Sequence, residues 1–166
     1  AIAGEISGYA HASDLSEAAL ARAAQTVKAV HSGHHGRLDV GPVGTNRQLY
    51  TPDNPLGLLP FEQKVKLLEE IDAYARAKDS RVRQVMCSIS GSWSAIQIIR
   101  GDGSRMADIR PLVRLNISVM VEENGRMETG SFGSGGRVTY DGVVDPAHWQ
   151  KGADEALRQA IVNLSS

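Results

Sequence analysis

The sequence predicts an α+β fold, in which a mainly antiparallel sheet with meander connections has about three helices packed on it. Two observations lead to this class. Apolar residues recur at helical spacing in three stretches, whereas residues 81–132 alternate apolar and polar side chains at every second position. Short glycine-containing turns separate the alternating stretches, so hairpins rather than long crossovers join the strands, which favours antiparallel pairing.

The first part of the chain is predicted to contain one strand and one helix. Residues 6–12 alternate small or apolar with polar residues, as in a short strand. Ser13 and Asp14 offer oxygens for a helix N-cap, and apolar residues then recur at helical spacing over residues 15–31. Glycine and proline are frequent over residues 32–57, which predicts a long loop. We expect apolar residues to fasten this loop to the core: Leu49, Tyr50, Leu56, Leu58 and Leu59.

Two further helices are predicted on either side of the alternating region. Pro60 suits a first helical turn, and the helix that it opens extends to about residue 78. The apolar stripe of this helix consists of Phe61, Val65, Leu67, Leu68, Ile71, Tyr74 and Ala75. Pro146 opens the last helix. The core-facing residues expected there are Trp149, Ala153, Ala156, Leu157, Ala160, Ile161 and Leu164.

The alternating region is predicted to form five short strands. They cover residues 81–90, 93–100, 104–108, 111–122 and 126–132. The glycine-containing segments at 101–103 and 123–125 predict tight hairpins. In the fourth strand, one face is expected to consist of Leu115, Ile117, Val119 and Val121, and the other of Arg114, Asn116, Ser118 and Met120.

Composition excludes several classes of protein. The chain has 166 residues, 42% of them hydrophobic, with 18 Lys+Arg against 19 Asp+Glu, which argues against nucleic-acid binding by bulk electrostatics. Cys87 is the single cysteine, as is typical of a reducing compartment. No apolar run reaches the ~18 to 20 residues of a membrane span, so we expect a cytoplasmic protein. The chain opens on Ala1 rather than Met and stops at Ser166 after an apolar pattern, so we interpret residues 1–166 as one truncated domain.

Most residues that could support chemistry have a simpler structural explanation. Three histidines follow the first helix: His31, His34 and His35. A polar loop explains them better than a metal site, which needs fixed geometry and supporting partners. Cys87 lies in mid-strand among apolar neighbours, so we interpret it as a small buried hydrophobe rather than a nucleophile. Trp93 and Trp149 are expected to anchor a core or an interface.

Two features leave alternatives open. The glycine-rich run over residues 130–136 could be a plain loop, a phosphate-binding loop, or a place where a peptide backbone or another domain approaches closely. Arg110 and Arg114 could bind carboxylates of a ligand, or could form structural ion pairs, which we favour. The acidic partners available for such pairs are Asp102, Asp108 and Glu122. The chain by itself shows no complete active site.

Several segments resemble the TldD/PmbA family and follow one another as they do in that family: residues 4–12, 107–115, 119–125, 133–137 and 160–165. The resemblance implies a cytoplasmic metallopeptidase, also called a modulator of DNA gyrase. In that family a TldD-type subunit pairs with a PmbA-type (TldE) subunit to degrade unfolded peptides and to mature small peptide precursors. The zinc motif, His-Glu-x-x-x-His with a later Cys, is expected downstream of this chain, and no histidine here matches it.

The resemblance therefore implies the N-terminal, non-metal portion of a zinc peptidase subunit, which shapes the substrate cleft and the subunit contacts. We expect no catalytic residue, metal ligand or cofactor in this chain, and neither zinc binding nor peptide cleavage by it alone. The expected partners are a PmbA/TldE-type subunit or a second copy, and peptides, without nucleic acid or membrane. The alternative is an interaction module that modulates DNA gyrase or a toxin–antitoxin system. The residues expected to contact substrate or the metal-bearing domain are Arg110, Arg114, Gly133, Gly135, Gly136 and Arg137.

Overall fold

The computed structural model describes residues 2–3, 6–28 and 49–165. The chain divides into two compact units, residues 1–45 and 46–166, where the sequence predicts one domain. The second unit holds the larger sheet and carries the candidate site. None of the described helices is long and apolar enough to cross a membrane.

The first unit contains a short hairpin and one helix. Strand β1 (Ile2–Ala3) pairs antiparallel with β2 (Ile6–Ser7), so the strand predicted over residues 6–12 is confirmed only at its first two residues. Helix α1 covers Glu17–Lys28. The predicted end of this helix, like the three clustered histidines, lies outside the described residues.

Helix α1 begins later than predicted because Ser16, rather than Ser13 or Asp14, caps it. The amide of Ala19 donates to Ser16 Oγ at 3.3 Å, which is the hydrogen bond of an N-cap side chain to the third helical residue. Asp14 instead accepts from the backbone amide of Ser16 at 2.9 Å and from its hydroxyl at 2.7 Å. The carboxylate therefore orients the capping residue.

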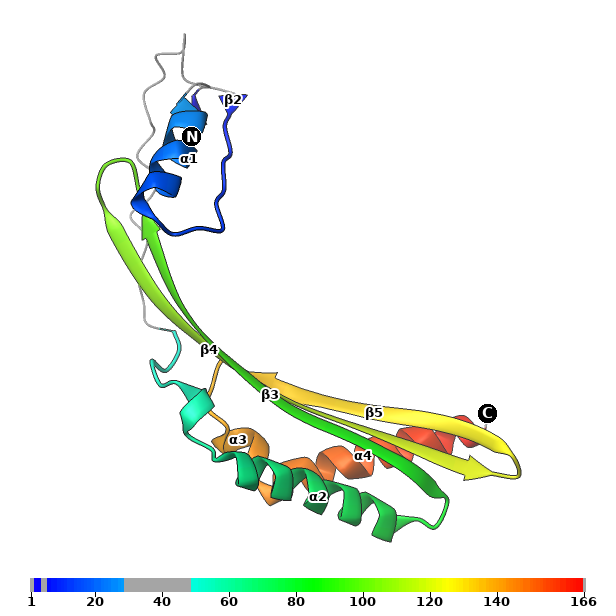
Figure 1. Cartoon of the computed structure of the whole chain (residues 1–166). Helices are drawn as coiled ribbons and strands as arrows, with labels where there is room; N and C mark the ends of the chain where they lie inside the picture. The colour runs from blue at the N-terminus through cyan, green and yellow to red at the C-terminus, as the bar shows by residue number, and fades with distance from the viewer. Residues whose placement is uncertain (1, 4–5, 29–48, 166) are drawn as a thin grey trace. The chain divides into compact units, whose positions relative to one another are not determined.

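The second unit is a three-stranded antiparallel sheet with helices on one face, which confirms the predicted α+β class (Figure 1). Its strands are β3 (Val82–Ile99), β4 (Arg105–Glu123) and β5 (Arg126–Gly136), in the order β3-β4-β5. Helix α2 (Phe61–Lys78) packs on β3, and α4 (Pro146–Leu164) packs on β4 and β5. Two short helices, η2 (Pro55–Gly57) and α3 (Asp141–Val144), precede α2 and α4.

The five predicted strands are wrong in number, because the first two form one continuous strand and so do the next two. Register is unbroken through Gly91, which pairs with Val113, and through Trp93, which pairs with Pro111. A Cβ at Gly91 would overlap the Tyr140 hydroxyl, so glycine here allows close packing rather than a turn. Pro111 lies beyond the end of β5, and an edge position tolerates a residue without N–H.

The glycine-rich run is also strand rather than loop. Strand β5 continues to Gly136, which pairs with Val113 at the end of the β4–β5 ladder. Gly135 has φ +156°, and a Cβ there would overlap the carbonyl oxygen of Val113. Glycine lets β5 lie tightly against β4 at this point, and the prediction of a plain or phosphate-binding loop is wrong.

The core lies between the sheet and the two long helices. The inner face of β4 is fully buried and consists of Val113, Leu115, Ile117, Val119 and Val121, as the alternation predicts. Helix α2 contributes Leu67, Ile71 and Ala75. Phe61 and Val65 are exposed, so the predicted apolar stripe is wrong at these two positions. At ~100° per residue, Val65 lies about 200° around the helix from the buried Leu67, on the side away from the core.

Helix α4 lies unusually close to β5, and the predicted core face of this helix is confirmed. Its small buried residues are Gly152, Ala153, Ala156 and Ala160. Its large buried residues are Trp149 and Leu157. The same helix covers the outer edge of β5. Gln159 Oε1 accepts from the amide of Ser131 at 3.2 Å, and Asn163 Nδ2 donates to the carbonyl of Thr129 at 3.1 Å. These side chains satisfy backbone groups that an edge strand would otherwise present to another chain.

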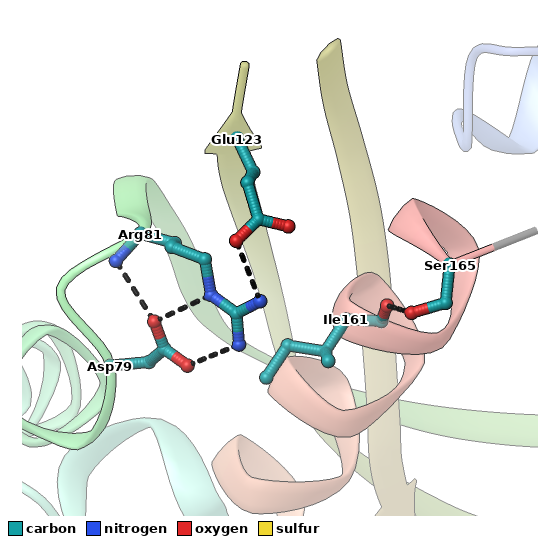
Figure 2. Close-up of polar contacts among 5 residues, drawn as sticks. All are labelled: Asp79, Arg81, Glu123, Ile161 and Ser165. Carbon is teal, nitrogen blue, oxygen red and sulfur yellow. Dashed lines mark hydrogen bonds and ion pairs between the residues drawn. The ribbon is translucent and has the colours of Figure 1, made fainter.

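Two polar contacts fix the segments around the sheet. Arg81, just before β3, donates from Nη2 to Asp79 Oδ2 at 2.8 Å and from Nη1 to Glu123 Oε1 at 3.4 Å, which joins the α2–β3 turn to the end of β4 (Figure 2). On the loop before α2, Trp93 Nε1 donates to the carbonyl of Pro52 at 3.2 Å. Pro55 is buried there.

The expected anchors of that loop are only partly right. Leu59 packs against the core, and Tyr50 lies beneath the guanidinium of Arg137, 5.3 Å from the ring centroid. Leu49, Leu56 and Leu58 are exposed.

Candidate functional site

The site lies on the face of the sheet that the helices of the second unit leave open. Side chains alternate along each strand, so the residues between the buried ones point to this face. Register places them in three neighbouring rows across β3, β4 and β5: Ser90–Arg114–Gly135, Ser88–Asn116–Gly133 and Met86–Ser118–Ser131. These residues are mostly small or polar, and the face is therefore hollow where β5 has glycine.

Arg114 is held across this face by a chain of hydrogen bonds. Its Nε donates to Asn116 Oδ1 at 2.9 Å, and Asn116 Nδ2 donates to Ser88 Oγ at 3.4 Å. A Cβ placed on Gly133 would stand 3.3 Å from Arg114 Nη2, so the guanidinium lies over the backbone of β5. The three side chains come from two strands and depend on their register.

Two adjoining cavities open beside this guanidinium, and both are lined by Arg114 and Gly133. One, of about 340 Å³, lies toward the row of Met86, Ser118 and Ser131. The other, of about 440 Å³, lies toward the end of β5, where Gly135 and Gly136 line it together with Leu112. We call the two cavities together the open-face groove. In the part of the chain that the structure describes, no carboxylate lines either cavity.

Arg114 donates to an amide oxygen, whereas most described arginines of the second unit pair with a carboxylate. Among the described residues of this unit, six arginines have a carboxylate within 4.0 Å: Arg76, Arg81, Arg83, Arg110, Arg126 and Arg158. Arg110 pairs with Asp108 at 2.6 Å, which confirms the structural pair favoured for it. That prediction is wrong for Arg114, which forms no ion pair with any described residue. Glu122 instead pairs with Arg83, and Asp102 accepts from the amide of Ser104.

The structure brings together four of the six residues expected to make contacts. Gly133, Gly135 and Gly136 line the groove with Arg114. Arg110 and Arg137 do not line it, because Arg110 is held by Asp108 and Arg137 lies over an aromatic ring. Whether any of these residues contacts a substrate stays a prediction.

Sequence reasoning missed the polar partners of Arg114. Asn116 and Ser88 orient the guanidinium, and Ser131 lines the groove on the neighbouring strand. The alternation in the fourth predicted strand already placed Arg114 and Asn116 on one face. The pairing that brings Ser88 beside them depends on a register that the sequence does not reveal.

Cys87 and the two tryptophans have structural roles. Cys87 is half-buried against α2, its thiol donates to the carbonyl of Leu68 at 3.6 Å, and burial raises the pKa of the thiol. Cys87 thus packs against the core as a small side chain, although it is half-buried rather than buried as predicted. Trp149 is buried in the core with its ring edge-on to Tyr74, while Trp93 anchors the preceding loop.

Metal-binding residues do not gather in the part of the chain that the structure describes. His148 Nε2 lies 2.7 Å from Ser134 Oγ on the helix-covered side of β5, and His11 stacks on Tyr9 in the first unit. Within residues 2–3, 6–28 and 49–165, no three His, Cys, Asp or Glu side chains are grouped so that they could hold a metal ion.

The fold and the groove thus define an α+β module with a groove on its open sheet face. A family model described as the PmbA/TldA metallopeptidase central domain matches residues 54–164, which are most of the second unit. The chain therefore belongs to the PmbA/TldD family of metallopeptidases. The description as a central domain differs from the N-terminal position that we expected, and the described residues do not fit the metal that the family name implies.

Similar proteins agree with this assignment. The chain is 44% identical to a metalloprotease TldD homologue of Haemophilus influenzae and 34% identical to one of Buchnera aphidicola, in each case over 100% of this chain and 36% of the relative. It thus spans about a third of the length of these relatives. A Thermotoga maritima crystal structure, described as a modulator of DNA gyrase, shares the fold with a TM-score of 0.54 at 16% identity, over 83% of this chain and 31% of that one.

Proposed function

We propose that this chain is the non-metal part of a TldD-like zinc metallopeptidase subunit, in which it forms a wall of the substrate cleft and contacts another subunit. The proteins that it resembles are named metalloproteases, and it corresponds to 36% of their length. The observation that carries the proposal is the open-face groove, where Arg114 is fixed over Gly133.

The groove suits a peptide in extended form. Beyond Gly133, over which the Arg114 guanidinium lies, Gly135 and Gly136 line the groove without side chains, so another backbone can approach closely. The side chains around them include the short hydroxyl groups of Ser88, Ser118 and Ser131, which offer hydrogen bonds, and the exposed apolar side chains of Met86 and Leu112. Such a surface fits unfolded or small peptides of varied sequence.

The metal would belong to the complete protein. Zinc supplies Lewis-acid activation of water and of the scissile carbonyl when it is bound. The role of this chain is to hold the peptide in position, since its described residues offer no group of metal ligands. We expect the chain alone neither to bind zinc tightly nor to cleave peptides.

The hairpin formed by β3 and β4 is the proposed region of subunit contact. Beyond Val113, where pairing with β5 ends, the two strands continue as a two-stranded ribbon. Ile98 and Ile99 near its tip are 51% and 61% exposed, and Leu112 is exposed as well. We propose a PmbA/TldE-type subunit or a second copy as partner, in the cytoplasm, without nucleic acid or membrane.

Peptide hydrolysis by the full-length protein tests the proposed cleft wall. Gly133→Val places a branched side chain where Arg114 and the groove meet, and should raise KM for an unstructured peptide about tenfold, with kcat, zinc content and melting temperature unchanged. The matched control is Arg83→Gln, which removes an arginine paired with Glu122 away from the groove and should leave KM unchanged. Unchanged KM in the Gly133 variant would contradict the proposal.

A further inference from the structure

We propose that Arg114 binds the C-terminal carboxylate of a peptide lying in the open-face groove. The inference rests on the proposed cleft function and adds to it the part of the substrate that is recognised. It follows from three features of the groove: the orientation of the guanidinium, the absence of acidic residues among the described residues of the lining, and the small or apolar character of the other side chains around it.

The guanidinium is oriented before any ligand arrives. Arg114 Nε donates its hydrogen bond to Asn116, and Asn116 in turn donates to Ser88. The two Nη groups of Arg114 therefore stay available to a ligand in the groove. Nη2 extends over Gly133, where a side chain would stand within 3.3 Å of it. Glycine thus leaves room for a planar group beside the guanidinium, and a carboxylate can accept two parallel hydrogen bonds in that geometry.

The charges around the groove favour an anion. Among the described residues, neither cavity lining includes Asp or Glu, and Arg114 has no carboxylate partner. Arg110, four residues away on the same strand and the same face, is already neutralised by Asp108 at 2.6 Å. The positive charge of Arg114 is therefore the one that a ligand carboxylate would meet in this groove.

The lining favours a terminal carboxylate over an acidic side chain. Ser88, Ser118, Ser131 and the glycines of β5 are small, and the larger lining residues Met86 and Leu112 are apolar, so neither carries a polar group that would select an acidic side chain. In such a lining Arg114 is the group that meets an anion, and the anion that every peptide has is its C-terminal carboxylate. The C-terminus is the end with negative charge, and its carboxylate matches the guanidinium.

Binding to the full-length protein, with metal removed by a chelator so that no cleavage occurs, tests the inference. The probe is the pentapeptide Ala-Gly-Ser-Gly-Ala with a free C-terminus, compared with its C-terminal amide and with an amidated peptide carrying one internal Asp. We expect the free acid to bind about tenfold more tightly than either amide, and Arg114→Gln to remove this difference. Arg83→Gln, the matched control, should preserve it, and thermal melting checks that every variant is folded.

The outcomes separate this inference from the proposed function. If the acid and the amide bind equally, or if Arg114→Gln weakens both alike, the terminal carboxylate is not recognised, although the groove still binds peptide. If the internal Asp restores affinity to the amide, an acidic side chain is the ligand and the inference fails. If none of the peptides binds, the inference fails. If Gly133→Val also leaves hydrolysis unchanged, the proposed cleft function fails as well.

Discussion

Gly130 of β5 and Ala156 of α4 lie in direct backbone contact. A Cβ on Gly130 would overlap the carbonyl oxygen of Ala156 and would stand 2.6 Å from the amide nitrogen of Ala160. Both neighbours are backbone atoms of a helix, so they cannot move aside as a flexible side chain can. The distance between helix and sheet is therefore set by the absence of a side chain at this position.

Gly130→Ala should accordingly destabilise the second unit. Inserting a methyl group into this contact forces α4 away from the sheet, with an expected loss of about 1–3 kcal/mol in the free energy of unfolding. Chemical denaturation followed by circular dichroism measures it. Gly101→Ala is the matched control, since a Cβ there meets nothing within 4 Å, and its effect should stay within about 0.5 kcal/mol. Equal stability of the two variants would refute the close contact.

Acid should weaken the turn between α2 and β3. Hydrogen bonds from Arg81 lower the pKa of Asp79 to about 2 from its ordinary 3.8. Because the folded-state pKa is the lower one, the stabilisation is complete above the ordinary value and is lost as the pH falls through about 2. We expect this pair to account for about 1 kcal/mol of the stability lost between pH 4 and pH 2.

Asp79→Asn tests that pH dependence. The variant should be less stable than the parent at pH 6 and should lose less stability on acidification, as urea titrations at several pH values would show. Glu69→Gln removes an exposed carboxylate of α2 as a control and should leave the pH profile unchanged. A parallel shift of the Asp79→Asn profile, with its slope intact, would exclude this carboxylate as the source.

The thiol of Cys87 should react slowly. Burial raises its pKa, and the reactive thiolate is therefore scarce near neutral pH. Alkylation by iodoacetamide at pH 8, followed by mass spectrometry, should be about tenfold slower or more in the folded chain than in urea. Cys87→Val should keep stability within about 1.5 kcal/mol, because the residue fills space beside the core. Alkylation at the same rate in both states would contradict this assignment.

The sequence predicts those parts of the fold that depend on neighbours along the chain. The burial of Ile117 and Val119 follows from alternation, and the buried face of α4 follows from helical spacing. Breaks at Gly91 and Pro111 are predicted wrongly because strand continuity depends on partners across the sheet. Gly135 extends β5 for the same reason, since tight packing against Val113 requires a glycine there.

The candidate site is less predictable than the fold for a related reason. Arg114 and Gly133 stand out in the sequence as a cation and a position without a side chain. Their contact results from a pairing that places Gly133 opposite Asn116, the residue that orients the guanidinium. Ser88 enters from a third strand, and nothing along the chain links it to the other residues.

The polar character of the open sheet face also limits what can cover it. Ser88, Asn116, Ser118 and Ser131 carry hydroxyl or amide groups that water can solvate in the absence of a partner. An aliphatic surface pressed onto them would displace that water without replacing its hydrogen bonds, at about 1–3 kcal/mol for each group left unsatisfied. An occupant that covers these four residues must therefore bring donors and acceptors of its own, as a main chain does.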